Sequence, residues 1–201
     1  MSSGSSLLVQ RQAWIFDLDG TLTQPVHDFD HIRRELGIAQ NDDILATLAA
    51  LPEDEKQQRA AQLNDLELYY AEQARPAPGV LELLECLAES SCQLGILTRN
   101  TREIALSSLE AIGALRYFDA SAVLGRDDAR PKPDAHGIQL LLEKWSCNPE
   151  QAVMVGDYCH DLASGRAAGA FTVHVDDRDR HWPELTDLRV ESLSELAKWL
   201  R

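Results

Sequence analysis

Short apolar runs alternate with amphipathic stretches along this chain. Runs of four or five mainly apolar residues occupy 13–16, 94–97, 152–155 and 171–175, and a weaker run occupies 120–124. Strands buried on both faces of a parallel sheet have this pattern, because neither face alternates with polar side chains. We therefore predict five strands of a parallel sheet.

Helical periodicity fills the intervals between these runs. The predicted helices are 80–89, 101–112, 135–145, 160–168 and 192–200. Thr101 is suited to cap the second helix and Ser192 or Ser194 the last, while Gly113 and Gly169 each follow a helix, as glycine commonly does. Strand–helix alternation of this kind predicts an α/β fold in three layers, with a central parallel sheet covered on both faces.

One segment, 24–77, contains helical patterns but no convincing strand. Its predicted helices are 29–36, 42–51 and a third that has Pro52 in its first turn and runs to about Ala74. Gly37 ends the first of these helices, and Asn41 is a candidate cap for the second. We interpret 24–77 as a helical cap domain inserted after the first strand, and 1–23 with 78–201 as the core domain.

Composition and charge narrow the range of partners. The 201 residues are 44% hydrophobic and 26% charged, as in folded globular proteins. The formal net charge of −14 disfavours nucleic acids and anionic membrane surfaces as partners. A small phosphorylated ligand is still compatible with this charge, because a bound divalent cation reverses the field locally.

The cysteines and the N-terminal residues indicate the cellular compartment. The four cysteines are Cys86, Cys92, Cys147 and Cys159, and their spacing matches no zinc site. Reduced thiols in a cytosolic protein are the simpler interpretation. No basic leader precedes a long apolar run, and no apolar stretch approaches the ~20 residues that span a bilayer. We expect a cytoplasmic protein.

Two aspartates follow the first predicted strand directly, in the stretch Asp17-Leu-Asp-Gly-Thr-Leu-Thr. Ligands collect at the carboxyl ends of strands in open parallel sheets. Asp17 and Asp19, one residue apart, can both reach one cation and one phosphate, and Gly20 permits a turn that brings the backbone close to a ligand. An ordinary turn with a helix cap is the alternative interpretation of this stretch.

Phosphate-binding groups are expected in two further segments. Thr98 ends a predicted strand and is followed by Arg99 and Asn100, and a hydroxyl with free backbone N–H groups can hold phosphate oxygens. Lys132 lies between two prolines, which restrict the backbone and aim the ammonium group. A helix cap at Thr98 and an exposed loop lysine at Lys132 are the alternatives.

A second acidic pair follows the strand 152–155. Asp157 and Asp161 lie four residues apart at a strand-to-helix junction. Carboxylates in this arrangement can bind a hard cation, which takes oxygen ligands. Helix capping by Asp157 with a surface Asp161 is the alternative interpretation.

Taken in this order, the four motifs resemble those of the haloacid dehalogenase superfamily. The resemblance extends from Trp14 to about Val190 and is most specific at 17–23. The chain looks most like the branch that includes phosphoglycolate phosphatase, where a helical cap follows the first motif, as 24–77 does here. The resemblance implies a Rossmann-like core, and an activity as a magnesium-dependent phosphatase that acts on a small phosphorylated metabolite through an aspartyl-phosphate.

The resemblance also implies roles for single residues. Asp17 would be the nucleophile and Asp19 the general acid–base. Mg²⁺ would be held by Asp17, by the backbone carbonyl of Asp19 and by Asp157. The residues that would hold the phosphate are Thr98, Arg99, Asn100 and Lys132. The residues that would support these groups from behind are Gly20, Thr21 and Asp161. Haloacid dehalogenases lack the second aspartate, so Asp19 favours a phosphate ester as substrate.

Several alternatives remain open at this level. A phosphosugar mutase shares the aspartyl-phosphate but keeps the phosphate on its product, and a binding protein could use an inactive copy of the fold. Substrate selection is expected from the cap, through His27, Asp28, Arg33 or Arg34, and His160 could lie near the mouth of the site. A solvated helix face explains these residues about as well. A monomer and a homodimer are both compatible with the sequence.

Overall fold

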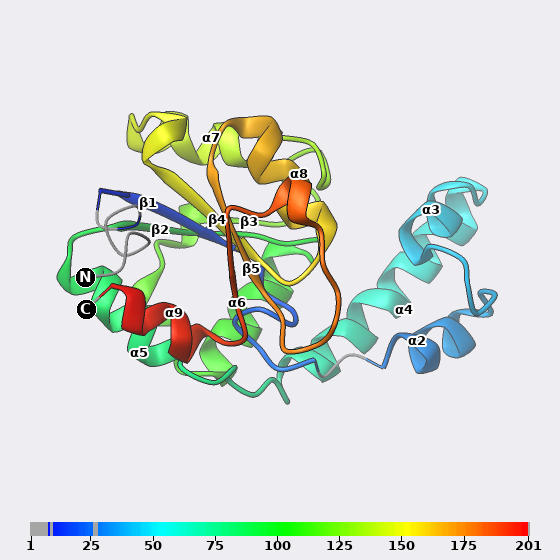
Figure 1. Ribbon diagram of the computed structural model, residues 1–201. Coiled ribbons are helices and arrows are strands. Elements are labelled where there is room, and N and C mark those ends of the chain that lie inside the picture. The colour runs from blue at the N-terminus through cyan, green and yellow to red at the C-terminus, as the bar shows by residue number, and fades with distance from the viewer. Residues whose placement is uncertain (1–7, 9, 26–27, 201) are drawn as a thin grey trace.

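A six-stranded parallel sheet forms the centre of the molecule (Figure 1). The computed structural model describes residues 8, 10–25 and 28–200. The strands are β1 Ala13–Phe16, β2 Gln93–Leu97, β3 Val123–Leu124, β4 Ala152–Gly156, β5 Phe171–Val175 and β6 Leu188–Val190. They lie in the order β3-β2-β1-β4-β5-β6, the arrangement of Rossmann-like folds. The predicted α/β class with a parallel sheet is therefore confirmed.

Helices cover both faces of this sheet, so that the core has three layers. The core helices are α5 Val80–Glu89, α6 Arg102–Ala111, α7 His136–Trp145, α8 Cys159–Ala168 and α9 Leu193–Trp199. Helices α5, α6 and α9 pack with one apolar cluster, and α7 and α8 pack with another on the opposite face. Thr101 and Ser192 cap α6 and α9 through their side chains, as their positions in the sequence predict.

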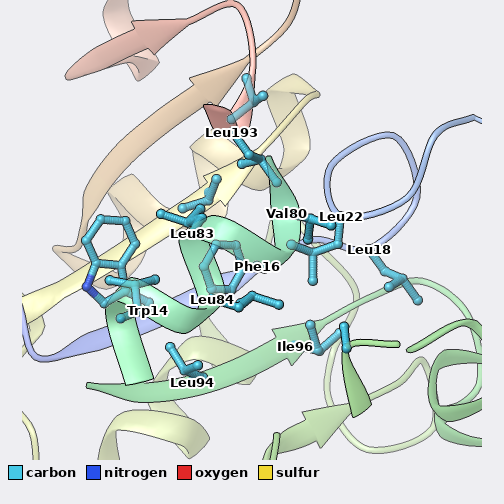
Figure 2. Close-up of a cluster of buried hydrophobic side chains, with 14 of the residues drawn as sticks. Trp14, Phe16, Leu18, Leu22, Val80, Leu83, Leu84, Leu94, Ile96 and Leu193 are labelled. Atoms are coloured by element: carbon cyan, nitrogen blue, oxygen red, sulfur yellow. The ribbon is translucent and has the colours of Figure 1, made fainter. Parts of the chain in front are cut away.

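Strand β1 contributes side chains to both clusters because successive residues point to opposite faces. Trp14 and Phe16 face α5 (Figure 2), and their rings lie 6.3 Å apart in a stacked arrangement. Ile15 faces α7 and α8. All four residues of β1 are buried, which holds the strand, and the loop that follows it, rigidly at the centre of the sheet.

The position of β1 also determines where a ligand can bind. It pairs with β2 on one side and with β4 on the other, and the chain connections leave the sheet in opposite directions from this point. Such a reversal opens a crevice outside the carboxyl ends of the strands. Asp17 follows β1 there, and its backbone N–H donates to the Val155 carbonyl at 2.9 Å, which extends the pairing with β4.

The insertion after β1 is helical and projects away from the sheet (Figure 1). Its helices are α2 Phe29–Leu36, α3 Ile44–Ala49 and α4 Glu53–Ala71. They enclose a small apolar cluster of their own, made by Ile32, Leu36, Leu48 and Leu63. The C-terminal part of α4 reaches back to the core and packs beside α6. Whether 24–77 is a separate domain stays a prediction.

Several element boundaries differ from those predicted. Residues 120–122 form a turn of 3₁₀-helix, so the predicted strand 120–124 is reduced to its last two residues. Helix α3 is shorter than 42–51, because Asp43 rather than Asn41 caps it, and Pro52 precedes the helical residues of α4. Strand β6 was not predicted. None of the helices in the described part of the chain is long and apolar enough to cross a membrane.

Candidate active site

A cavity of about 300 Å³ lies between the carboxyl ends of the central strands and the helical insertion. The core residues around it are Asp17, Asp19, Thr98, Arg99, Asn100, Lys132, Asp157, Tyr158, His160 and Asp161. The insertion contributes Phe29, Arg33, Asp43, Ile44, Leu45 and Glu67. The topology therefore brings together residues that are more than 140 positions apart in the sequence, and every predicted catalytic, phosphate-binding and metal-binding residue lies in this wall.

Lys132 joins two buried carboxylates at the floor of the cavity. Its Nζ atom lies 2.6 Å from Oδ1 of Asp17 and 2.6 Å from Oδ1 of Asp161. The Lys132 side chain is 3% exposed, so this is an interior ion triad rather than a surface contact. A desolvated lysine between two acids is costly unless the charges are compensated, and here both neighbours compensate it.

Burial shifts the proton equilibria of this triad. Burial raises the pKa of Asp17 well above its usual value, and the charges of Asp161 and Asp19 add to the shift while Lys132 opposes it. Burial lowers the pKa of Lys132, but the charges and hydrogen bonds of Asp161 and Asp17 outweigh it and raise the pKa overall. A further positive charge at this point would favour the ionised form of Asp17.

The side chains of Asp17, Asp157 and Asp161 form a candidate cation site. One carboxylate oxygen from each lies within 4.8 Å of the others. Gly20 forms a cradle for this cluster: a Cβ atom there would lie 2.9 Å from Oδ2 of Asp157, and the φ angle of Gly20 is 86°. Carboxylate oxygens suit Mg²⁺, which is a hard cation. The three carboxylates carry more negative charge than the single ammonium group of Lys132 offsets. From the sequence we expected only a supporting role for Asp161, but its carboxylate oxygen lies as close to the cation site as those of Asp17 and Asp157.

Asp19 and the residues after β2 line the next part of the wall. Asn100 donates from Nδ2 to Oδ2 of Asp19 at 2.7 Å, which orients that carboxylate. The Thr98 hydroxyl accepts from the backbone N–H of Asn100 at 3.1 Å and is nearly buried. Thr21 donates from Oγ1 to Oδ2 of Asp17 at 3.4 Å. Asn100 and Thr21 therefore each bond to one of the two aspartates, and Thr98 holds the backbone of Asn100.

The side of the cavity toward the insertion contains two arginines. Arg33, from α2, donates to the Asp42 carbonyl at 3.1 Å and to Asp30 at 3.3 Å. Arg99 pairs with Asp43 across the mouth, with an N–O distance of 2.9 Å. His160 also lines the cavity.

The other residues named for substrate selection are placed differently. Asp28 caps α2 by accepting from the backbone N–H of His31 at 2.8 Å. Arg34 is exposed and is not among the lining residues. His27 lies outside the described residues.

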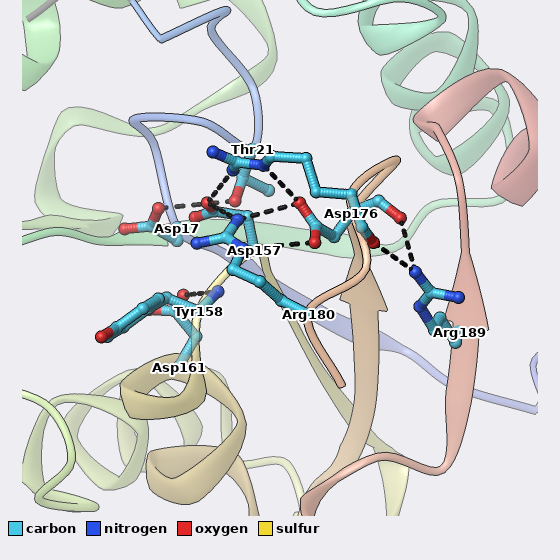
Figure 3. A network of polar contacts seen from close by, with 9 residues as sticks. Asp17, Thr21, Asp157, Tyr158, Asp161, Asp176, Arg180 and Arg189 are labelled. Atoms are coloured by element: carbon cyan, nitrogen blue, oxygen red, sulfur yellow. Dashed lines mark hydrogen bonds and ion pairs between the residues drawn. The ribbon is translucent and has the colours of Figure 1, made fainter. Parts of the chain in front are cut away.

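A group behind Asp157 was not predicted from the sequence (Figure 3). Asp176 follows β5, and Arg178 and Arg180 lie in the loop after it. Arg180 donates from Nη2 to Oδ2 of Asp157 at 3.0 Å. Burial and the charge of Asp161 raise the pKa of Asp157, and Arg180 and Arg178 oppose this shift. In the sequence, only Asp176 and Asp177 at the end of the run 171–175 pointed to polar residues here. Nothing in the sequence indicated that the loop after them folds back onto Asp157.

Comparison with known proteins identifies a family for this chain. The model of the haloacid dehalogenase-like hydrolase family matches residues 14–175. A haloacid dehalogenase-like hydrolase domain-containing protein of Arabidopsis thaliana is 30% identical over 209 aligned positions, which cover 92% of this chain and 82% of that protein. Phosphoglycolate phosphatase of Agrobacterium fabrum is 32% identical over 184 positions, which cover 80% of this chain and 78% of the enzyme.

Solved structures have the same fold. CbbY of Rhodobacter sphaeroides, solved in complex with phosphate, superposes with a TM-score of 0.75 over 92% of this chain and 96% of its own. The two sequences are 18% identical, so the likeness concerns the fold alone. The fold, the order of the motifs and the similar enzymes all indicate the haloacid dehalogenase-like hydrolase family.

Proposed function

Because this chain belongs to the haloacid dehalogenase-like hydrolase family, whose members similar to it include an enzyme named as a phosphatase, we propose that it is a magnesium-dependent phosphomonoesterase. Its substrate would be a small phosphorylated metabolite, cleaved through a phospho-aspartate at Asp17. The observation that supports this most directly is the convergence of Asp17, Asp157 and Asp161 within 4.8 Å, with Lys132 at 2.6 Å from two of them.

In the first proposed step, an oxygen of Asp17 attacks phosphorus in line with the leaving oxygen. The bond from phosphorus to the ester oxygen breaks, and Asp19 gives its proton to that oxygen. In the second step Asp19 takes a proton from water, which attacks phosphorus and releases inorganic phosphate and free Asp17. The hydrogen bond from Asn100 fixes Asp19 for both transfers.

Charge compensation is the main requirement of the first step, because an anionic nucleophile approaches an anionic phosphate. Lys132 supplies one positive charge beside Asp17. When bound, Mg²⁺ supplies further charge stabilisation and a fixed orientation for the phosphate. Asp17, Asp157 and Asp161 would hold it, together with the backbone carbonyl of Asp19. Thr98, Asn100 and Arg99 are proposed to contact the phosphate.

The far end of the cavity is proposed to select the leaving group. Arg33 lies there beside Phe29, Ile44 and Leu45, so a substrate with both an anionic and a short carbon portion would fit. The volume of about 300 Å³ suits a small metabolite and is at the lower end for ligand pockets. This refines the expectation from the sequence by choosing Arg33 over its neighbour Arg34.

The proposed activity is tested with p-nitrophenyl phosphate. We expect turnover that depends on added Mg²⁺ and a loss of at least about 10³-fold in Asp17→Asn, which removes the nucleophile. Release of inorganic phosphate from natural phosphate esters would distinguish hydrolysis from the mutase alternative, which retains phosphate on its product. No turnover of any ester with Mg²⁺ would favour the inactive binding protein.

Location and assembly are part of the same proposal. None of the four cysteines forms a disulfide, which is the condition of thiols in the reducing cytoplasm. We propose a cytoplasmic enzyme, as a monomer or a homodimer, with neither nucleic acid nor membrane as partner.

A further inference from the structure

Three residues of the loop after β5 lie beside Asp157, and we call Asp176, Arg178 and Arg180 together the polar bracket. Figure 3 shows Asp176 and Arg180. Arg180 donates from Nη2 to Oδ1 of Asp176 at 2.8 Å and from Nε to Oδ2 of Asp176 at 3.2 Å. The same Nη2 atom reaches Oδ2 of Asp157 at 3.0 Å. The proposed reaction steps assign no role to this bracket.

The bracket is held in place from several sides. Asp176 is 4% exposed and also accepts from Nε of Arg178 at 2.9 Å. The Arg180 guanidinium lies 5.6 Å from the ring centre of Tyr158 and 5.9 Å from that of Trp182, within range of cation–π attraction. A planar guanidinium with two bonds to one carboxylate has little freedom, so Arg180 is a fixed donor.

The Asp157 carboxylate contacts this fixed donor and also lies close to Gly20. Its Oδ2 atom accepts from Arg180 and lies 3.4 Å from Nη2 of Arg178. A Cβ atom at position 20 would lie 2.9 Å from Oδ2 and 3.2 Å from Oδ1, so the carboxylate takes up space that only a glycine leaves free. The two guanidinium groups therefore hold the carboxylate by its Oδ2 atom.

We propose that Arg180, fixed by Asp176, is a positioning residue that leaves Asp157 only one oxygen for a cation and thereby favours Mg²⁺ over Ca²⁺. This inference rests on the metal site of the proposed function. Mg²⁺ requires a compact octahedron and few carboxylates, whereas Ca²⁺ takes six to eight oxygens and accepts both oxygens of one carboxylate. Chelation by both oxygens of Asp157 would bring the cation toward the guanidinium groups, which repel it.

The test is calorimetric titration of the substrate-free protein with MgCl₂ and, separately, with CaCl₂. We expect wild type to bind Mg²⁺ more tightly than Ca²⁺. Arg180→Gln should weaken Mg²⁺ binding by about tenfold, as is usual when a group that orients a ligand is lost. Ca²⁺ binding should change less, because a released Oδ2 can join the coordination. The ratio of the Ca²⁺ to the Mg²⁺ dissociation constant should therefore fall, by up to about tenfold.

Two further variants separate position from charge. Arg180→Lys keeps the positive charge but loses the planar fork, and we expect it to lower the ratio in the same direction. If Arg180→Gln fails to fold, Arg180→Lys takes its place in the test. Arg116→Gln removes an equal charge from an exposed arginine that pairs with Glu85 and does not line the cavity, and should leave both constants unchanged.

The outcomes distinguish this inference from the proposed function. Wild type that binds neither cation would overturn the metal site, and the inference with it. Wild type that binds Mg²⁺, with an unchanged ratio in the Arg180 variants, would overturn the positioning role alone. Tighter binding of both cations by Arg180→Gln would also overturn it, because the arginine would then act only as a competing charge.

Discussion

Gly20 and Asp157 approach each other so closely that no other residue fits at position 20 without displacing the carboxylate. The φ angle of 86° adds a cost of about 1 kcal/mol for any residue with a Cβ atom. We predict that Gly20→Ala lowers the free energy of unfolding by about 1–2 kcal/mol and weakens Mg²⁺ binding by at least about tenfold. Thermal unfolding and calorimetric titration measure the two effects.

Gly37 offers a matched control for this substitution. It has a similar φ angle of 65°, but nothing lies within 4 Å of the Cβ position. Gly37→Ala should therefore show the backbone cost without any loss of Mg²⁺ affinity. Equal Mg²⁺ affinity in both variants would contradict the close approach at Asp157.

The raised pKa of Asp17 predicts how the activity depends on pH. Attack on phosphorus requires the ionised carboxylate, and burial, with Asp161 and Asp19, favours the protonated one. A bound cation favours ionisation and thus lowers this pKa. The acid limb of kcat/KM should move to lower pH as Mg²⁺ rises, by up to about one unit per tenfold increase below saturation. A limb that stays fixed, or moves to higher pH, in profiles at several Mg²⁺ concentrations would refute this coupling.

Neighbouring arginines in α2 permit a sharp test of substrate selection. Arg33 lines the cavity, whereas Arg34 is exposed outside it. Arg33→Ala should raise KM for esters with an anionic leaving group by about 10-fold or more, as expected for one lost charged hydrogen bond. Arg34→Ala should leave KM unchanged. Initial rates over a panel of charged and neutral phosphate esters measure this, and equal behaviour of the two variants would exclude Arg33 from selection.

Sequence reasoning was most informative for residues that directly follow strands. Asp17, Thr98 and Asp157 could be located because the carboxyl ends of parallel strands meet at one edge. Arg180 could not, because its contact with Asp157 depends on a loop that folds back over 23 positions. Local patterns contain no information on such a contact.

Two ion pairs link α4 and α3 to the core, and their burial differs. Arg126, after β3, holds Glu67 of α4 through two hydrogen bonds of 3.1 and 2.9 Å, with side chains 16% and 8% exposed. The Arg99–Asp43 pair is 44% and 47% exposed. A nearly buried ion pair with two hydrogen bonds fixes a helix far better than a solvent-exposed ion pair does. We therefore regard the Glu67 junction as the fixed attachment of the insertion.

This difference predicts unequal effects on stability. Glu67→Gln leaves the Arg126 charge without its anion and should lower the free energy of unfolding by about 2–4 kcal/mol. Asp43→Asn should cost less than about 1 kcal/mol, because the pair is solvated and asparagine can also cap α3. Urea denaturation of both variants measures the difference. A larger loss in Asp43→Asn would reverse our assignment of the fixed attachment.

At the level of elements, long periodic segments were predicted well and short ones poorly. The bounds of α2 and α5 agree with the prediction, because an apolar face and a following or preceding glycine define them. Strands β3 and β6 have two and three residues, too few to show a pattern. Helix α3 begins two residues later than predicted because Asp43 competes successfully with Asn41 for the cap.

At the scale of the whole molecule, three carboxylates from separate segments meet at one edge of the sheet, those of Asp17, Asp157 and Asp161. The net charge of −14 would repel a phosphorylated substrate, and only local compensation makes binding feasible. The positive charges of Lys132, Arg33 and Arg99 in the cavity wall supply part of this compensation. The fold achieves this by placing β1 between β2 and β4, so that segments far apart in sequence end at the same crevice. Strand order is a long-range property, which the pattern of single elements could not give.

The central claim is that Asp17 bonds covalently to phosphorus during turnover. Rapid mixing with a phosphorylated substrate and Mg²⁺, followed by acid quench and borohydride, reduces an acyl phosphate to an alcohol that peptide mass spectrometry can locate. We expect the side chain at position 17, and no other carboxylate, to be reduced to homoserine in a substrate-dependent manner. Steady release of phosphate without any reduction at Asp17, or with reduction at another residue, would contradict the account.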